Sequence, residues 1–320
     1  MKAIRVHHIG EPDVLRFEDT ADLHAGANQV VVKIEAVGIN PVETYIRAGK
    51  YPMKAALPYT PGSDGAGTIS QVGEGSTWNI GDRVFIARSL SGTYAQFALC
   101  EADMVFRLPD NTSFEQGAAI GVPYATAHRA LFGKANAKEG ESVFIHGATG
   151  GVGVAAIQLA KAAGLTVGGS AGSRSGERFL SSLGLKYTTD HNAPNYLSDV
   201  IGMTCGRGFD IVLEMLANQN LGSDPEVLAP FGRIVVIGNR GTTEVNPRDW
   251  MARDITIYAM TLFNVPREEL RSIYASIVEG LENGELKPVV DPRRFALEQA
   301  PDAHRAVTEA GSHGKIVLVP

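Results

Sequence analysis

The sequence predicts an α/β protein in two parts, a doubly wound parallel sheet and a mainly antiparallel, barrel-like β domain. Glycine and proline turns are closely spaced before Pro109, whereas strands and helices alternate after Ser142. Short strands between frequent turns are typical of an antiparallel barrel, and regular alternation is typical of a parallel sheet with helices on both faces. At 320 residues the chain is long enough for two such cores.

The first part reads as β-structure. Strands are expected at residues 29–38, 84–86 and 94–97, the first rich in β-branched residues and the others preceded by glycine turns. After Pro109 the pattern changes to helix. Thr112 or Ser113 can cap a short helix, because Glu115 and Gln116 can reach back to its free amides. A second helix is expected at 122–130.

The second part alternates regularly. The expected strands are residues 143–146, 165–169, 187–189, 209–213, 233–238 and 255–263, the last ending the sheet. The expected helices are residues 152–163, 175–183, 196–203 and 221–229. A further helix at 267–282 and a closing strand at 315–319 form a tail that we expect to fold back onto the first part. The expected domains are therefore residues 1–122, 123–263 and 264–320, the last completing the first.

A glycine-rich turn, Gly147-Ala-Thr-Gly-Gly-Val-Gly153, lies directly between the first strand of the alternating part and its helix. Glycine at this place allows a sharp turn, a close approach of the backbone to a pyrophosphate, and tight packing of the helix on the strand. The free amides and the dipole of the helix start then face the phosphates. The position therefore predicts a dinucleotide site, against the alternative of a glycine-rich turn without a ligand.

The end of the second strand indicates which dinucleotide binds. An NAD site places Asp or Glu about 20 residues beyond the glycines, where it binds the ribose hydroxyls. Residues 168–178 instead carry small hydroxyl side chains together with Arg174 and Arg178. Glu177 is expected on the following helix. Because a 2′-phosphate needs cationic donors and is repelled by a carboxylate, the sequence predicts NADPH.

Motifs over nearly the whole chain carry a resemblance to a known family. They are residues 38–47, 57–64, 81–84, 146–153, 214–218, 220–221, 239–241 and 246–248. Together they resemble the zeta-crystallin-like NADPH:quinone oxidoreductases of the medium-chain dehydrogenase/reductase superfamily. The resemblance implies a Rossmann NADPH-binding domain and a GroES-like catalytic domain. The segments 214–218 and 246–248 are more specific to this type than the glycines are.

The resemblance also implies which residues contact NADPH. They are Tyr45, Thr149, Gly150, Gly151, Val152, Gly172, His191, Asn220, Ile237, Gly238, Asn239, Arg240, Met260, Thr261 and Leu262. Arg178 stands where this type has a basic residue near the 2′-phosphate. Arg174 departs from a pattern that tends to be acidic, and the added cation should strengthen the preference for NADPH.

The sequence predicts no metal site. Zinc-dependent relatives hold the metal with Cys and His near the start of the chain, but residues 38–45 contain neither. Cys100 and Cys205, the two cysteines, cannot form a four-cysteine structural site. Without a metal nothing lowers the pKa of an alcohol, so alcohol oxidation is difficult. A quinone is already electrophilic and needs mainly an apolar slot that holds it against nicotinamide C4, which we expect in the interdomain cleft.

Three polar side chains are candidates for that slot. Asn40, Tyr45 and Tyr51 are expected to line it and to donate hydrogen bonds to the developing oxyanion. Arg47 is expected to be an exposed arginine at a helix end, and Asp64 to order its own turn.

The acceptor and the biological role have alternatives. The same scaffold without zinc could reduce α,β-unsaturated carbonyls with NADPH, as an alkenal or enoyl reductase. A non-enzymatic, NADPH-binding crystallin or RNA-binding protein is a further alternative. The formal charge of −6 and the absence of a Lys/Arg cluster argue against a nucleic-acid partner.

Composition also bears on location and assembly. Two cysteines and an N-terminus without a signal-like apolar stretch lead us to expect a cytoplasmic protein that does not bind membranes. The expected strand 255–263 would leave an apolar edge on the sheet. Such an edge usually needs a partner, so we expect a homodimer or homotetramer formed through it.

Overall fold

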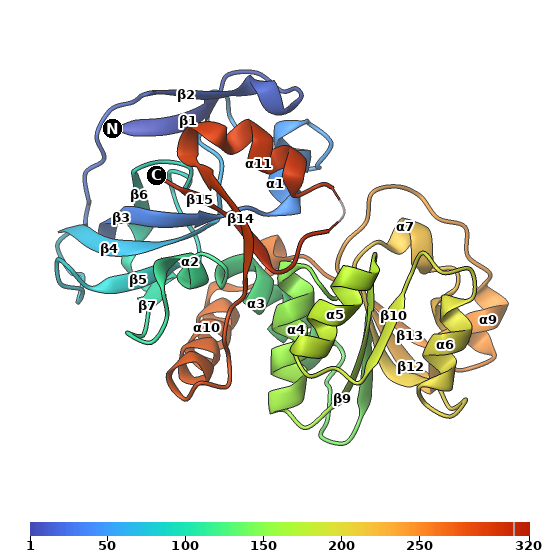
Figure 1. The fold of residues 1–320 in the computed structure, drawn as a ribbon. Coiled ribbons are helices and arrows are strands. Elements are labelled where there is room, and N and C mark those ends of the chain that lie inside the picture. Colours follow the sequence, from blue (N-terminus) through green and yellow to red (C-terminus); the bar gives the residue numbers. More distant parts are fainter. Residues whose placement is uncertain (310) are drawn as a thin grey trace. The chain divides into compact units, whose positions relative to one another are not determined.

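The computed structural model describes residues 1–309 and 311–320, which form two compact units (Figure 1). Unit 1 comprises residues 1–122 and 267–320, and unit 2 comprises residues 123–266. Unit 2 is therefore continuous in sequence, whereas unit 1 is built from two separate segments. Among the described residues, no helix combines the length and the apolar character that crossing a bilayer requires.

Unit 2 is built on a six-stranded parallel sheet. Its strands are β8 (Ser142–Ile145), β9 (Thr166–Ala171), β10 (Tyr187–Asp190), β11 (Phe209–Glu214), β12 (Leu228–Val236) and β13 (Thr256–Ala259). They lie in the order β10-β9-β8-β11-β12-β13, and every neighbouring pair is parallel. The chain starts in the middle, moves to one edge, and then returns to build the other half. The point where the direction reverses, between β8 and β11, is where doubly wound sheets bind ligands.

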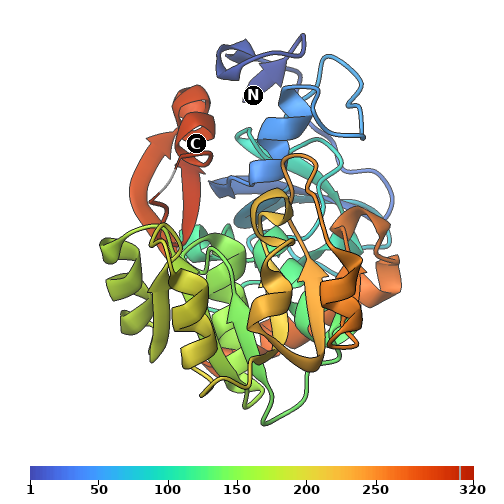
Figure 2. The ribbon, with the colours of Figure 1, turned by 90° about the vertical axis from the view of Figure 1, so that its right-hand side faces the viewer.

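Helices precede, connect and follow these strands. They are α3 (Gly121–His128), the π-helix η3 (Arg129–Lys134), α4 (Gly151–Ala162), α5 (Arg174–Ser182), α6 (Tyr196–Gly202), α7 (Ala217–Asn220), α8 (Asp224–Val227), α9 (Pro247–Met251) and the 3-10 helix η4 (Leu262–Asn264). Helix α4 packs on β8 and β9, and α5 packs on β9 and β10 (Figures 1 and 2). On the other half, α6 contacts α8, and α8 contacts β12. Phe144, Phe209 and Ile234 are fully buried in this part of the core.

The predicted doubly wound sheet is confirmed, but several predicted bounds in unit 2 are wrong. Within the expected helix 221–229 only residues 224–227 are helical, as α8, and β12 already begins at Leu228; a second short helix, α7, ends at Asn220, before the expected range. Pro225 lies in the first turn of α8, where proline starts a helix rather than continuing one. The expected strand 255–263 is shorter, because β13 ends at Ala259 and Thr261 caps η4 instead.

Unit 1 is mainly antiparallel. Its strands are β1 (Lys2–Val6), β2 (Leu15–Asp19), β3 (Gln29–Gly38), β4 (Asp64–Val72), β5 (Arg83–Ile86), β6 (Phe97–Glu101), β7 (Val105–Arg107), β14 (Val290–Ala296) and β15 (Lys315–Val319). Seven of them follow the order β14-β15-β3-β4-β5-β7 with β6 also paired to β3, while β1 and β2 form a separate pair. Strand β15 is antiparallel to β3, so the C-terminal segment extends the sheet of the N-terminal one. The expected strand 94–97 is shifted, since β6 begins at Phe97.

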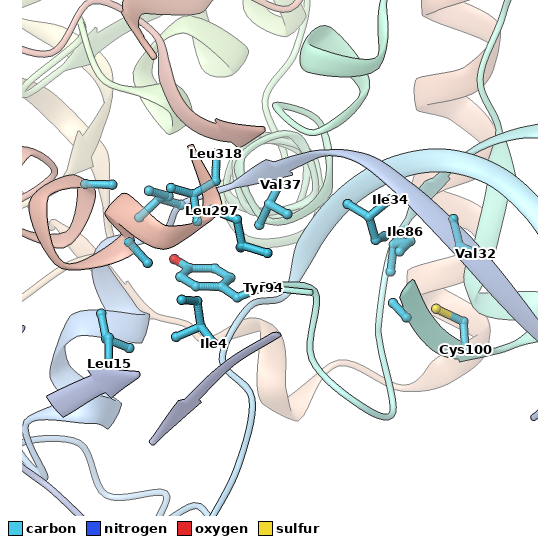
Figure 3. Packing of buried hydrophobic residues seen from close by; sticks show 14 of the residues in the cluster. Ile4, Leu15, Val32, Ile34, Val37, Ile86, Tyr94, Cys100, Leu297 and Leu318 are labelled. Atoms are coloured by element: carbon cyan, nitrogen blue, oxygen red, sulfur yellow. The ribbon is translucent and has the colours of Figure 1, made fainter. Parts of the chain in front are cut away.

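Short helices complete unit 1. They are η1 (Pro12–Val14), α1 (Pro41–Arg47), η2 (Ala102–Met104), α2 (Phe114–Gly117), α10 (Arg267–Glu282), η5 (Leu297–Gln299) and α11 (Ala300–Ala306). The predicted cap of α2 is confirmed: the Gln116 N–H donates to Ser113 Oγ at 3.2 Å, and the Ser113 N–H donates to Gln116 Oε1 at 3.0 Å. Figure 3 shows Tyr94 among the aliphatic side chains of the core, including Ile4 and Leu297.

Candidate functional site

The predicted cofactor residues of unit 2 all follow carboxyl ends of its strands. Residues 149–152 follow β8, Gly172 follows β9, His191 follows β10, Asn220 follows β11, residues 237–240 follow β12 and residues 260–262 follow β13. The carboxyl ends of parallel strands share one edge of a sheet, so these segments come together there. None of these residues is buried. The segments that follow the six strands therefore form a solvent-accessible surface along this edge of the sheet.

The glycines of the first turn have different surroundings. Gly147 has a φ of +56°, which favours glycine. A Cβ on Gly153 would lie 2.5 Å from the carbonyl oxygen of Ala148, so this glycine permits the close packing of helix on turn. A Cβ on Gly150 would meet only the Gly147 oxygen, at 3.7 Å. The backbone at Gly150 is therefore open to a ligand, as a pyrophosphate requires.

The start of α4 has no side-chain cap. Gly150 is its N-cap residue and offers no side-chain acceptor. By contrast, Ser173 caps α5 by accepting a hydrogen bond from the Gly176 N–H at 3.2 Å. The first amides of a helix need acceptors, and an anion can supply them. The start of α4 is thus suited to a phosphate.

The helix that follows β9 carries the positive charge that a 2′-phosphate requires. Arg174 is the first residue of α5 and Arg178 is one turn further, so both lie on one side of the helix. Both side chains are exposed. Glu177 also lies within α5, and the residues that join β9 to α5, Gly172 and Ser173, carry no carboxylate.

A buried polar cluster lies directly beneath this edge. The cluster, here called the His146 cluster, consists of His146, Glu214 and Asp224, whose exposed fractions are 3%, 0% and 0%. His146 Nε2 lies 2.9 Å from Asp224 Oδ1 and 3.6 Å from Glu214 Oε2. Burial raises the pKa of both the Glu214 and the Asp224 carboxyl to about 7. Burial also lowers the pKa of His146.

The His146 cluster is connected to the cofactor segments. Glu214 Oε1 accepts from the backbone N–H of Leu216, and from Asn220 Nδ2 at 3.2 Å. The backbone carbonyl of Glu214 accepts from the Ile237 N–H at 2.9 Å. His146 immediately precedes Gly147. This cluster could not be predicted from the sequence, because Asp224 lies in a segment between β11 and β12 that carries no motif.

The three predicted acceptor-site residues lie in and around α1 of unit 1. Asn40 immediately precedes the helix, Tyr45 lies within it, and Tyr51 follows it. The side chains of Tyr45 and Tyr51 are partly exposed, whereas Asn40 is only 3% exposed. Its amide donates to Glu43 Oε1 at 3.2 Å and to Asp64 Oδ2 at 3.0 Å. Both amide protons of Asn40 are therefore used inside unit 1.

Asp64 does not order its own turn, so that prediction is wrong. Its Oδ2 accepts from Lys315 Nζ at 2.7 Å, and its Oδ1 accepts from the Val122 N–H at 2.7 Å. Lys315 Nζ also donates to Asn40 Oδ1 at 2.5 Å. These contacts join β4, β15 and the start of α1 in a buried network. Local sequence patterns cannot predict it, because its residues are far apart in the sequence.

Arg47 is not exposed, contrary to the prediction. Its exposed fraction is 5%. Nearby, the hydroxyl of Tyr94 donates to Glu43 Oε2 at 2.7 Å and contacts His304 Nε2 at 3.0 Å. Burial, followed by the charge of Arg47, lowers the pKa of His304 to about 3. His304 is therefore neutral at physiological pH.

Two family models match the chain. The alcohol dehydrogenase GroES-like domain matches residues 26–110, and the zinc-binding dehydrogenase domain matches residues 151–279. The quinone oxidoreductase of Homo sapiens is 45% identical over 322 residues, covering 100% of this chain and 98% of that protein. The quinone oxidoreductase of Mus musculus is 45% identical over 325 residues, again covering 100% and 98%.

Solved structures agree in fold. An NAD-dependent alcohol dehydrogenase has a TM-score of 0.93 at 28% identity and covers 100% of both chains. A mycobacterial protein in complex with NADPH has a TM-score of 0.90 at 28% identity and also covers 100% of both. The CurK enoyl reductase has a TM-score of 0.90 at 28% identity, covering 99% of this chain and 98% of that one.

These matches confirm the family expected from the motifs, together with its two-part fold. They extend over both units, and the identity to the curated relatives holds over the full chain. The protein is an oxidoreductase that uses a nicotinamide cofactor. It belongs to the zeta-crystallin-like quinone oxidoreductase family of the medium-chain dehydrogenase/reductase superfamily.

Proposed function

We propose that this protein reduces quinones with NADPH and without a metal ion. The observation that carries the choice of cofactor is the end of β9, where Arg174 and Arg178 lie on α5 with no carboxylate between strand and helix. The choice of acceptor is supported by the curated relatives, which are named quinone oxidoreductases at 45% identity over the whole chain. Residues 38–45 contain no Cys or His, which supports chemistry without zinc.

The residues of unit 2 bind and orient the cofactor in this proposal. The uncapped start of α4 receives the pyrophosphate, and Arg174 and Arg178 receive the 2′-phosphate. Segments 237–240 and 260–262 hold the nicotinamide half. When bound, NADPH supplies the hydride at nicotinamide C4.

The residues around α1 serve the acceptor. Tyr45 and Tyr51 donate hydrogen bonds to the oxygen that gains negative charge. The Asn40 amide is tied to Glu43 and Asp64, so its contribution is to fix the start of the helix that carries Tyr45. Replacing Tyr51 by Phe should lower kcat without unfolding the protein, because only one hydroxyl is removed.

The cofactor choice is tested by binding NADPH and NADH in parallel. The double substitution Arg174→Ala and Arg178→Ala should weaken NADPH binding by about tenfold or more, since hydrogen bonds to charged groups contribute about 1.5–3 kcal/mol. NADH binding should hardly change. Lys186→Ala is the matched control, because this exposed cation precedes β10 at the opposite edge of the sheet. Equal losses for both nucleotides would contradict the proposal.

A second candidate acceptor is an α,β-unsaturated carbonyl compound. The similarity of the fold to the CurK enoyl reductase, at a TM-score of 0.90, favours it. Conjugate hydride addition also needs no metal. Turnover with 1,2-naphthoquinone or 9,10-phenanthrenequinone should exceed turnover with 2-alkenals if quinones are the substrates, and the reverse order would favour the second candidate.

We also propose that the protein is a homo-oligomer formed through β13. Among the described residues this strand pairs on one side only, with β12. Two large apolar side chains of the same unit, Phe231 and Met251, are each 74% exposed. An open strand edge with apolar surroundings is suited to pairing with a second copy. A monomer by light scattering would contradict this assembly.

A cytoplasmic location is part of the proposal. Cys100 is buried and Cys205 is exposed, and both are free thiols. A reducing compartment preserves free thiols, which supports this location. Cell fractionation that finds the protein outside the cytoplasm would contradict it.

A further inference from the structure

The His146 cluster contains two buried oxygen atoms without a hydrogen-bond partner. Glu214 Oε2 and Asp224 Oδ2 are both inaccessible and unpartnered among the described residues. The facing atoms of the three side chains, one from each, lie within 4.8 Å of one another. With both carboxylates ionised and His146 neutral, the cluster would hold two negative charges out of contact with water. Such an arrangement is costly unless a positive charge or a proton compensates it.

One proton bound between the two carboxylates would compensate one of the two buried negative charges. A carboxyl that gains a proton becomes a donor, so one acid can hydrogen-bond the other and remove one of the two charges. Donors that already reach the cluster include the Leu216 N–H and Asn220 Nδ2, both bound to Glu214 Oε1. They leave Glu214 Oε2 and Asp224 Oδ2 as the sites where the proton is needed.

We infer that His146, Glu214 and Asp224 are positioning residues that hold a shared proton, and that holding this proton is coupled to cofactor binding. The inference rests on the proposed function. Of the segments proposed to contact NADPH, Asn220 is bound by a side chain of this buried cluster, the glycine turn follows His146 directly, and Ile237 binds the backbone of Glu214.

The direction of the coupling follows from charge. The phosphates of NADPH bring negative charge to the strand ends above the cluster, and negative charge nearby favours the protonated form of an acid. Because burial raises the pKa of Glu214 and of Asp224 to about 7, the proton is held below pH 7 and is lost as the pH rises through 7. NADPH binding should therefore be tightest below pH 7 and should take up protons from solution above it.

Other titratable groups around the cluster do not account for this behaviour. Burial, followed by the charges of Asp224, Glu214 and Glu226, raises the pKa of Tyr196 to about 12. Partial desolvation lowers the pKa of His191, which also interacts electrostatically with Asp190 and His146. Glu226 on α8 is exposed. His191 is the histidine of this group outside the cluster, so it needs its own control.

Calorimetry provides the test. NADPH and NADH are titrated into the whole protein at pH 7.5 in two buffers of different ionisation enthalpy, which gives the number of protons taken up on binding. The wild-type protein should take up a fraction of a proton with both nucleotides, and Glu214→Gln and Asp224→Asn should take up none. NADH is included because it lacks the 2′-phosphate, which titrates by itself. His191→Gln should lower nucleotide affinity, because His191 is an expected NADPH contact, but the number of protons taken up per bound nucleotide should persist.

Asp210→Asn is the matched control. Asp210 lies on the same strand, β11, but near its amino end, where Oδ2 accepts from the Ser142 N–H at 2.8 Å. This variant neutralises a partly buried carboxylate that binds Ser142 and Arg207, and it should keep both the proton uptake and the pH profile. In the wild type, NADPH affinity should fall between pH 6.5 and 8.5, by up to about tenfold for each unit of pKa change on binding. The Glu214→Gln profile should be flat.

Several outcomes would overturn the inference. Proton uptake that persists in Glu214→Gln and Asp224→Asn would assign the coupling elsewhere, and an equal loss of affinity at every pH would indicate a structural role only. A stoichiometric divalent ion in the purified protein, absent from Glu214→Gln, would show that a metal compensates the charge in place of the proton. Wild-type protein that binds neither nucleotide would instead refute the proposed function, so the two failures are distinguishable.

Discussion

Gly150 and Gly153 lie in the same turn, yet their surroundings assign them different tasks. A Cβ at position 153 would collide with the backbone of Ala148, whereas a Cβ at position 150 would enter open space. One glycine is therefore required by the packing of α4 on its own turn. In the proposed function, Gly150 is required because the pyrophosphate of NADPH approaches the backbone there.

This difference gives a paired prediction. Gly153→Ala should lower the free energy of unfolding by about 1–3 kcal/mol, because overpacking a rigid backbone contact forces the helix to shift. Gly150→Ala should leave the unfolding free energy nearly unchanged but weaken NADPH binding. Urea denaturation and fluorescence titration of both variants check this. Equal stability of the two variants would contradict the assigned roles.

His304 makes stability depend on pH in unit 1. Its pKa is about 3 in the folded protein, mainly because of burial, and about 6.5 in an unfolded chain. Between pH 6.5 and pH 3, His304 is therefore protonated in the unfolded state but neutral in the folded state. The free energy of unfolding falls as the pH decreases through this range. Between pH 7 and pH 5 the wild type should lose about 2 kcal/mol more than His304→Gln.

The glutamine keeps a donor nitrogen near Tyr94 but cannot titrate. The control is His24→Gln, which changes an exposed histidine of the same unit and should retain the wild-type pH dependence. Urea denaturation at both pH values measures the effect. If the two glutamine variants behave alike, burial of His304 does not govern the acid sensitivity.

Local sequence patterns could predict some of these residues but not others. The glycine turn and the cap at Ser113 could be predicted because their partners lie within a few residues. The contact of Asp64 with Lys315 could not, because the two are 251 residues apart in the sequence. Arg47 was expected at the surface for the same reason: the elements that cover it lie elsewhere in the chain.

At the scale of elements, Lys315 connects parts of unit 1 that are distant in sequence. It lies at the start of β15 and binds Asp64 at the start of β4 and Asn40 before α1. Its side chain is only 4% exposed, so water cannot replace these contacts. The network thus fixes the helix that carries Tyr45.

Lys315→Met should therefore destabilise the protein strongly. Removing one partner leaves the Asp64 charge buried, at a cost of about 3–5 kcal/mol. Adding Asp64→Asn should restore part of the loss, because the remaining group is neutral. Lys33→Met is the control, since Lys33 pairs with Glu35 at the surface and such pairs contribute about 0–1 kcal/mol. Similar losses for the two lysines, measured by urea denaturation, would contradict the role of the network.

The order of the elements was easier to predict than their ends. Alternating apolar runs and turns in residues 142–238 predicted the parallel sheet, because each run has to be buried on both faces. The region between β11 and β12 was predicted poorly. Helices as short as α7 and α8 are too short to carry a periodic pattern of their own, and α8 packs on α6 and β12.

At the scale of the whole molecule, the proposed assembly depends on one edge strand. Ala259→Glu places a charge on the exposed side of β13, so that two copies would bring like charges together. We expect this variant to be monomeric by size exclusion with light scattering. Ile80→Glu is the control, because Ile80 is 73% exposed in unit 1 and its replacement should leave the assembly intact. An unchanged assembly in Ala259→Glu would exclude this edge as the interface.

Because unit 2 interrupts unit 1, the two units differ in how the chain can acquire its structure. All strands of the unit 2 sheet lie within residues 123–266, so this sheet can form without the rest of the chain. Strand β3 of unit 1, by contrast, pairs with β15, which follows residue 266 in the sequence. The entropy of closing a loop grows with its length, and a loop that has already collapsed into a folded body is effectively shorter. Early folding of unit 2 would therefore speed the completion of unit 1. A substitution that slows the folding of unit 2 should thus also delay the burial of Tyr94, although Tyr94 lies in unit 1.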